Sequence, residues 1–452
     1  MTKHDSNRIG QEIRKEHSFP AVSAVLSDGT IVEMVFEPIS KRTSFVLAKD
    51  GESRIADSVA LDERTRLVPY SPRNNILAHD VVLFPSEPEE YGSEEELLRE
   101  IESFIHRYVD LSPLFEKIAS YYVLLTWVYE RFNELPYLRL RGEPGSGKTR
   151  FLLTVGSLCY KPMFASGAST VSPLFRIIDS FRVTLVIDEG DFRLSDERAD
   201  ISKIVNNGNA KGFPVLRSEA TGKRGEFNPH AYEVYGPKLI ATRGYFEDRA
   251  LESRCLTEET SGRTLRDDIP ISLPPEHREE ALHLRNKLLL YRLRNLGANG
   301  GSIASPDRGI EPRLNQIFLP LLSVVKDQND REELRALARR YHGEMISERG
   351  MDLEAQILEV IRDLRSAGQP LAVKEITSWL QDRHGEEYER KITTKWIGNV
   401  LRRKLQLKPT RSRSGYVLPP EELPKVDRLY DRYGITAAET DRAPGDELPP
   451  AL

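Results

Sequence analysis

The sequence predicts an α/β fold whose centre is a parallel sheet with crossover helices. Strand-like and helix-like patterns alternate from residue 137 to about residue 257, which is typical of a parallel sheet. A glycine-rich turn, "GEPGSGKT", lies between a strand pattern and a helix pattern. A later apolar run, "VTLVI", fits a strand that is buried on both faces. The 452 residues exceed one compact core, so two to four domains are expected.

Segments of different composition flank this centre. "SDG" and "KDGES" each separate two apolar, strand-like runs and predict hairpins in an all-β N-terminal domain. An acidic stretch, "SEPEEYGSEEE", then begins a helical region, and the polar end of the chain is expected to be disordered. The predicted boundaries are 1–18 for a polar segment, 19–86 for the β-rich domain, 87–264 for the core with the glycine-rich turn, 265–348 for a helical lid and connector, 351–434 for a C-terminal domain and 435–452 for the tail.

Composition limits the classes of function. With 39% hydrophobic and 30% charged residues, the chain has a globular composition, and its net charge of -5 excludes a uniformly basic surface. Any contact with nucleic acid must therefore come from local basic patches. The two cysteines, Cys159 and Cys255, lack metal-ligand spacing and are expected to be buried thiols in a reducing cytoplasm. The longest apolar stretch, residues 121–129, is far shorter than the ~20 residues that cross a bilayer, so no membrane span is predicted.

The glycine-rich turn is the strongest chemical signal. It matches the pattern G-x-x-x-x-G-K-[ST] of a phosphate-binding P-loop, against the alternative of a chance glycine-rich turn. Its backbone amides would surround a phosphate, helped by the N-terminus of the following helix. Lys148 would reach the β- and γ-phosphates, and Thr149 would ligate Mg²⁺. The predicted nucleotide-binding residues are Gly142, Glu143, Pro144, Gly145, Ser146, Gly147, Lys148 and Thr149.

An acidic pair follows the apolar strand in "VIDEGD". The strand delivers Asp188 and Glu189 to its carboxyl end, where open α/β sheets bind ligands. Asp188 would hold the shell of the Mg²⁺ ion, and Glu189 would polarise the attacking water. A capped surface turn is the alternative interpretation. The cofactors predicted from these two motifs are ATP and Mg²⁺.

The order of the motifs resembles that of AAA+ ATPases. The P-loop is followed by "VIDEGD", a basic hairpin, "KLIATRG", "ESRC" and "EPRLNQIFLPLL". More narrowly, this order resembles the MCM-like helicases of mobile elements such as staphylococcal cassette chromosomes, and it is similar to phage and plasmid ATPase domains. The resemblance covers roughly residues 97–348 and a C-terminal winged helix, whereas residues 19–86 match no family that we can name.

The resemblance implies roles for four further residues. Thr242 ends the strand in "KLIATRG" and would orient the water as a polar sensor, although many relatives have Asn there and a strand-ending Thr can simply cap a turn. Arg254, in preference to Arg249, would complete the site of a neighbouring subunit. Arg313, on the first turn of a helix, would be a lid arginine that closes on the nucleotide. A surface ion pair or a solvated helix start remains the alternative for these arginines.

The hairpin "FPVLRSEATGKRGEFNPHAYEVY" carries positive charges on a glycine-flanked turn. In MCM-like enzymes a hairpin at this point projects into the pore of a hexamer. The resemblance therefore implies that Lys223 and Arg224 hold DNA phosphates, with Arg217 contributing from the stem. Exposed charges on a rigid loop suit backbone contact without sequence readout, but basic hairpin tips are also ordinary solvated turns.

The C-terminal domain reads as three helices followed by a hairpin, which describes a winged helix. No acidic residue occurs from residue 391 to residue 420, a pattern typical of a recognition helix and wing in contact with DNA. The alternative is a protein-interaction module. The predicted DNA-binding residues of this domain are Lys391, Lys395, Arg402, Arg403, Lys404, Lys408, Arg411 and Arg413.

Together these features predict a homo-hexameric, ATP-dependent DNA helicase or translocase that acts in the replication of a mobile element. Single-stranded DNA would lie in the pore and duplex DNA at the winged helix, and the N-terminal domain would form a collar or bind a replication partner. The alternative is an ATP-dependent switch on DNA that loads or recruits another factor without unwinding. A regulator with a degenerate ATPase core is disfavoured by the two intact nucleotide motifs.

Overall fold

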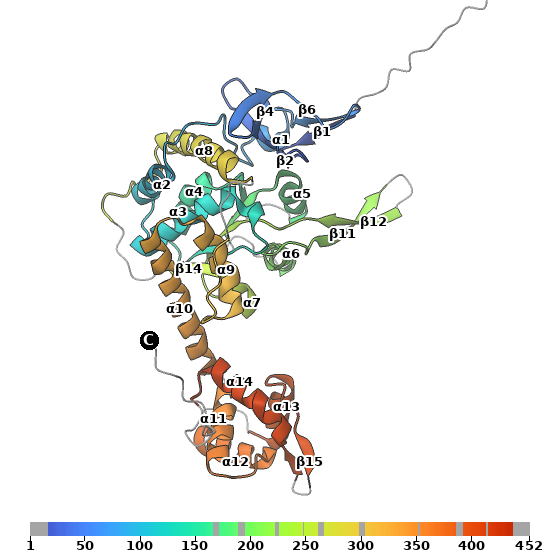
Figure 1. The fold of residues 1–452 in the computed structure, drawn as a ribbon, viewed down its shortest axis with the longest axis vertical. Helices are drawn as coiled ribbons and strands as arrows, with labels where there is room; N and C mark the ends of the chain where they lie inside the picture. The colour runs from blue at the N-terminus through green and yellow to red at the C-terminus, as the bar shows by residue number, and fades with distance from the viewer. Residues whose placement is uncertain are drawn as a thin grey trace, which may run out of the picture. The chain divides into compact units, whose positions relative to one another are not determined.

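The computed structural model describes residues 17–165, 171–188, 195–221, 226–246, 248–260, 266–297, 303–350, 353–385, 392–412 and 415–436. The chain divides into two compact units, Met1–Leu334 and Arg335–Leu452. The finer domain boundaries stay predictions. Figure 1 shows the elements of both units. Within the described residues, no helix is long and apolar enough to cross a membrane.

The first unit is built on a five-stranded parallel sheet, which confirms the predicted α/β core. Its strands lie in the order β14-β8-β13-β10-β9, and every neighbouring pair is parallel. Because all strands run the same way, their carboxyl ends meet at one edge of the sheet. Their bounds are β8 (Tyr137–Arg141), β9 (Pro162–Ala165), β10 (Thr184–Asp188), β13 (Lys238–Thr242) and β14 (Cys255–Glu259).

Helices lie around this sheet (Figure 1), and the first two of them, α2 and α3, have clear start signals. Ser93 and Glu96 form a capping box that begins α2, and Ser112 caps α3 with Pro113 in its first turn. α3 is buried over most of its length, as its apolar sequence predicts. The bounds are α2 (Glu94–Tyr108), α3 (Pro113–Trp127), η1 (Tyr129–Arg131), α4 (Lys148–Leu158), α5 (Val171–Phe181), α6 (Ser195–Asn207), α7 (Arg249–Glu252), α8 (Glu276–Asn295) and α9 (Pro312–Val324). A further helix, α10 (Gln328–Gly350), contains the boundary between the two units.

The N-terminal strands form two small sheets, as the hairpin signals predict. One is antiparallel, with strands β2 (Ser23–Val25), β3 (Ile31–Glu37), β4 (Arg42–Lys49) and β5 (Glu52–Ala56). The other joins β1 (His17–Ala21), β7 (Thr65–Pro69) and β6 (Val59–Ala60), followed by the short helix α1 (Asn75–Ala78). Gly29 and Gly51 make the two tight turns with positive φ angles. These sheets share one hydrophobic cluster with the parallel sheet, so they pack on the core.

A long antiparallel hairpin interrupts the core between β10 and β13. It consists of β11 (Val215–Thr221) and β12 (Glu226–Tyr232), whose last pair is Thr221 and Glu226. In Figure 1 the hairpin extends beyond α5 and α6. The predicted DNA-contacting residues of its tip, Lys223 and Arg224, lie outside the described residues.

The second unit contains the predicted three helices and hairpin. They are α11 (Leu353–Ser366), α12 (Val373–His384), α13 (Thr394–Arg403), β15 (Thr410–Ser412) and β16 (Gly415–Val417). The chain continues into η4 (Pro420–Glu422) and α14 (Leu423–Tyr433). Val426 and Tyr430 of α14 join the hydrophobic core of this unit, so α14 belongs to the fold and is an addition to the predicted pattern.

Candidate nucleotide-binding site

The P-loop lies where the sequence predicts it, between β8 and α4. Gly145 and Gly147 have φ angles of +83° and +85°, the left-handed region that favours glycine. Gly147 is the residue that precedes the first turn of α4. Gly142 meets a different constraint, because a Cβ atom there would lie 1.8 Å from Oγ1 of Thr260. Backbone conformation and close packing therefore explain three of the glycines in this loop.

Lys148 and Ser146 present polar groups to this loop. The side chain of Lys148 folds back, and its Nζ donates hydrogen bonds of 2.7 Å to the carbonyl oxygens of Gly142 and Glu143. Burial lowers the pKa of Lys148, and the nearby Asp188 carboxylate opposes that effect. The hydroxyl of Ser146 is buried without a hydrogen-bond partner. An ammonium group, an unpartnered hydroxyl and a helix N-terminus fit a bound phosphate group.

Residues that fit a magnesium ion lie at the same edge of the sheet. Asp188 ends β10 and pairs with Ala241 of β13, while Thr149 is exposed on the first turn of α4. A carboxylate and a hydroxyl are oxygen ligands of the kind that Mg²⁺ takes beside nucleotide phosphates. Glu189, the predicted base, lies outside the described residues.

Thr242 has a geometry that agrees with the turn-capping alternative. It is fully buried, and its hydroxyl donates a hydrogen bond of 3.0 Å to the carbonyl oxygen of Gly244. Its own carbonyl accepts a hydrogen bond of 3.1 Å from the amide of Gly142. The strand end is thus joined directly to the P-loop, and the next residue, Arg243, is exposed beside it. Sequence reasoning missed Arg243, although the motif "KLIATRG" contains it.

A buried charge network supports the P-loop strand and was also missed. Arg139, which is fully buried, donates to Glu252 with Nη1 at 2.8 Å and to the hydroxyl of Thr257 with Nε at 3.0 Å. Arg141, the last residue of β8, forms ion pairs with Glu252 and Glu259. Burial raises the pKa of Glu252, but the two arginines outweigh this and hold it below its usual value. Glu252 therefore joins the P-loop strand to α7.

The predicted arginines lie near the amino-terminal ends of the strands, whereas the P-loop lies at the carboxyl ends. The carbonyl oxygen of Arg254 accepts a hydrogen bond of 2.9 Å from the amide of Tyr137, the first residue of β8. At ~3.3 Å per residue, the length of β8 puts roughly 16 Å between this end and the P-loop. Arg254 Nη1 donates to Oδ1 of Asn206 at 2.7 Å. This position cannot reach the nucleotide of the same chain, and it is compatible with action on a neighbour.

Arg313 lies near Arg254 and away from the P-loop. Its Nη2 donates a hydrogen bond of 3.3 Å to the carbonyl oxygen of Ala250, and both burial and the Arg254 guanidinium lower its pKa. The structure therefore brings Arg313 together with Arg254, and its closing on a nucleotide as a lid arginine stays a prediction. The physical reason is the placement of α9, which packs against α3. Arg249 is exposed at the start of α7.

The predicted DNA-binding residues fall into two groups. In the hairpin stem, the guanidinium of Arg217 lies 4.2 Å from the centre of the Phe175 ring, so it packs on α5. In the second unit, Ile397, Val400 and Leu401 of α13 are buried, and basic residues occupy the exposed positions around them. The exposed basic residues are Lys395, Arg402, Arg403, Lys404, Lys408 and Arg411, and Lys404 pairs with Glu354 at 2.7 Å. Lys391 and Arg413 lie outside the described residues.

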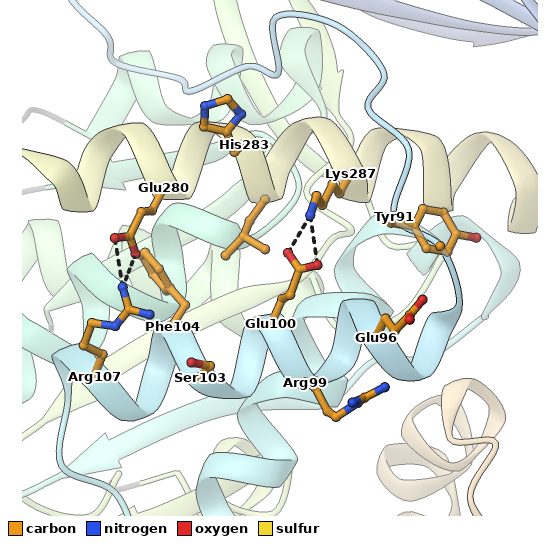
Figure 2. Close-up of a pocket in the computed structure, with 12 residues that line it drawn as sticks. Tyr91, Glu96, Arg99, Glu100, Ser103, Phe104, Arg107, Glu280, His283 and Lys287 are labelled. Carbon is orange, nitrogen blue, oxygen red and sulfur yellow. Dashed lines mark hydrogen bonds and ion pairs between the residues drawn. The ribbon is translucent and has the colours of Figure 1, made fainter.

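A separate cavity of about 730 Å³ lies between α2 and α8 (Figure 2). Two ion pairs cross it, from Arg107 to Glu280 at 2.9 Å and from Lys287 to Glu100 at 2.7 Å. None of the residues that line it belongs to the P-loop or to the end of β10. These two ion pairs join α2 to α8.

The fold and the site define a P-loop α/β domain. No protein-family model matches the sequence, and no curated protein matches it. The fold is similar to those of several solved structures, all at low identity. The active helicase Cch of SCCmec type IV is 12% identical over 90% of this chain and 95% of that chain, with a TM-score of 0.40.

Two further structures match with lower TM-scores. The C-terminal region of NrS-1 is 11% identical over 85% of this chain and 95% of that chain, with a TM-score of 0.35. Cdc6p from Pyrobaculum aerophilum is 15% identical over 78% of this chain and 99% of that chain, with a TM-score of 0.21. At these values the similarity does not decide the function of this chain, which rests on its own residues.

Proposed function

We propose that this protein is an ATP-hydrolysing DNA motor, a helicase or translocase of the AAA+ class. The observation that carries the proposal is the P-loop itself. Gly145 and Gly147 have positive φ angles there, and Lys148 is buried close to the Asp188 carboxylate at the end of β10. These groups support the proposal, because a bound phosphate needs a loop of backbone amides and an ammonium group, and its Mg²⁺ takes a carboxylate ligand. The motif order "GEPGSGKT", "VIDEGD" and "KLIATRG" supports the choice of class.

Binding begins with an exchange of hydrogen bonds at Lys148. Its ammonium group leaves the carbonyl oxygens of Gly142 and Glu143 and turns to the β- and γ-phosphates, while the amides of the loop and of the first turn of α4 surround them. Thr149 and Asp188 would hold Mg²⁺, which neutralises charge on the phosphates when it is bound.

Hydrolysis then needs a positioned water. The water oxygen forms a bond to the γ-phosphorus, and the bond from that phosphorus to the β–γ bridging oxygen breaks, so that ADP leaves with the electron pair. Glu189 follows Asp188 in sequence and is the residue we assign to accept the proton of the water. Asp188, the preceding residue, would remain a ligand of Mg²⁺ and would not accept the proton.

A second copy of the chain would complete the site. Arg254 lies at the amino-terminal end of β8, and the P-loop of the same chain lies at the carboxyl end. Any catalytic contact that Arg254 makes must therefore be with the nucleotide of a neighbour. Arginines supplied in this way stabilise the charge on the transferred phosphoryl group. The proposed assembly is a homo-hexamer, with DNA in its pore.

DNA contact is assigned to two surfaces. The hairpin β11–β12 would carry Lys223 and Arg224 at its tip, where they bind phosphates of single-stranded DNA. The exposed basic face of α13 would bind duplex DNA, with Lys395, Arg402 and Arg403 toward the backbone. Movement of the hairpin with the nucleotide cycle would then drive translocation, in replication of a mobile element.

A second candidate is an ATP-dependent switch that loads another factor on DNA without unwinding it. The observation in its favour is that the basic face of α13 is exposed and would bind DNA without the hairpin. Arg217, moreover, packs on Phe175 in the stem. A switch would need the winged helix and the P-loop, but not the hairpin tip.

The test is the steady-state ATPase rate with and without single-stranded DNA. Lys223→Ala/Arg224→Ala is compared with the unaltered protein and with Lys41→Ala/Arg42→Ala, which removes an exposed Lys–Arg pair at the start of β4. DNA stimulation that is lost only in the first variant supports the motor. Stimulation that survives in both variants supports the switch. An absence of DNA stimulation in the unaltered protein contradicts the helicase proposal.

A further inference from the structure

Arg243 occupies a position beside the P-loop that no assigned role explains. The hydrogen bond of 3.1 Å from the amide of Gly142 to the carbonyl oxygen of Thr242 joins the end of β13 to the start of the P-loop. Arg243 is the next residue after this bond, and its side chain is exposed. The backbone therefore fixes its Cα atom at the mouth of the phosphate site.

The local charges at this mouth favour an anion. Lys148 is held in the loop and is the first residue of α4. Arg243 lies close enough to add to the lowering of the Lys148 pKa that burial causes. Two cations and a helix N-terminus that converge in this way repel one another when nothing lies between them. Asp188 supplies one opposing carboxylate, whereas the triphosphate of ATP carries several negative charges.

The neighbouring residue is already committed to another contact. The hydroxyl of Thr242 donates to Gly244 at 3.0 Å and is fully buried, so it would have to break a turn before it could bind water or phosphate. An arginine one position later has the length to reach past the strand end. It also offers several N–H donors with the geometry that suits a phosphate group.

We propose that Arg243 binds the terminal phosphate of the nucleotide held by the P-loop of its own chain, and that it takes the sensing role at this strand end in place of Thr242. The inference rests on the proposed ATPase function. Arg243 would stabilise the negative charge that the γ-phosphoryl oxygens carry in the transition state. It would also distinguish ATP from ADP, because ADP lacks the group that it binds.

The experiment measures kcat, KM and the affinities for ADP and for a non-hydrolysable ATP analogue in Arg243→Ala and Arg243→Lys. The control is Arg54→Ala, an exposed arginine of β5 outside the site. For Arg243→Ala we expect kcat to fall about a hundredfold, as for loss of one transition-state donor. The affinity for the ATP analogue should fall about tenfold, the size of one charged hydrogen bond. The affinity for ADP should stay unchanged, and Arg243→Lys should recover part of kcat.

Two results would overturn the inference. If Arg243→Ala keeps the kcat and the preference for the ATP analogue of the unaltered protein, Arg243 does not bind the terminal phosphate. If the affinity for ADP falls as much as that for the analogue, Arg243 supports the loop as a whole. Failure of the proposed function is recognised separately, since the unaltered protein would then neither bind nor hydrolyse ATP.

Discussion

The carboxylate of Glu33 on β3 accepts a hydrogen bond of 2.7 Å from Nε of Arg292 on α8, and both side chains are 2% exposed. The same carboxylate accepts a hydrogen bond of 2.9 Å from the hydroxyl of Tyr160, and the ammonium group of Lys161 lies 3.4 Å away. Arg292 also pairs with Glu130 at 2.6 Å. The N-terminal sheet is therefore joined to the rest of the first unit by buried ion pairs as well as by apolar packing.

Removal of this carboxylate should be costly. Glu33→Ala leaves Arg292 and Lys161 buried with less compensation, so we expect the free energy of unfolding of the first unit to fall by about 3–5 kcal/mol. Chemical denaturation measures the change, and Glu52→Ala on the exposed strand β5 is the matched control. A loss no larger than that of the control would show that the network contributes little.

His277 should make the stability of the first unit depend on pH. Burial, helped by three nearby arginines, lowers the pKa of His277 from its ordinary value of 6.5 to about 4. Its ring packs between Phe104 and Tyr108, at 5.0 and 4.8 Å between centroids. The unfolded chain then binds more protons than the folded chain between pH 6.5 and about pH 4, so stability falls as the pH falls through that window.

Replacement of this histidine should remove that dependence. His277→Phe should flatten the fall of the denaturation midpoint between pH 7 and pH 5. His283→Phe, at an exposed position of the same helix, is the control for the substitution itself. An equal slope in His277→Phe and the unaltered protein would assign the pH dependence to other groups.

Gly142 should be intolerant of a side chain for a steric reason. A methyl group at this position would lie 1.8 Å from Oγ1 of Thr260, so Gly142→Ala should shift the P-loop and weaken ATP binding about tenfold or more. The double variant Gly142→Ala/Thr260→Ala removes the nearest atom and should recover part of the affinity. Equilibrium titration with a fluorescent ATP analogue measures both, and unchanged binding in the single variant would contradict the packing argument.

Arg254 should act only between chains. Arg254→Ala and Lys148→Ala are each expected to lose ATPase activity, the first because the neighbouring site lacks its arginine and the second because its own P-loop is inactive. Mixed oligomers of the two variants contain interfaces with an intact Lys148 and an intact Arg254. Activity should therefore return in the mixture. Equal inactivity of the mixture and of the separate variants would remove Arg254 from the site.

The sequence predicted those parts of the site that are local. The P-loop spans eight consecutive residues, and its glycines and Lys148 have recognisable spacing. The parallel sheet followed from the alternation of patterns, because buried strands are continuous apolar runs. The sequence alone does not indicate that Arg285 and Arg292 of α8 are buried, because their carbonyl and carboxylate partners lie far away in the sequence.

The parts that the sequence missed depend on contacts between distant residues. Arg139 and Glu252 are 113 residues apart, and neither position has a motif around it. The position of Arg313 was also not predictable, since its helix pattern does not reveal which edge of the sheet it meets. Arg243 was overlooked because a single basic residue after a strand has no distinctive spacing. Only the bond between Thr242 and Gly142 places it.

The pairing of the partly buried Glu252 with Arg139 and Arg141 has a consequence for the coupling of subunits in the proposed hexamer. Strand β8, which ends at the P-loop, is joined through Glu252 to α7, the short helix that precedes Arg254. A displacement of that strand on hydrolysis would be transmitted to the neighbour's nucleotide as a push on its arginine. In the proposed hexamer, this connection would couple hydrolysis in one subunit to the site of the next subunit.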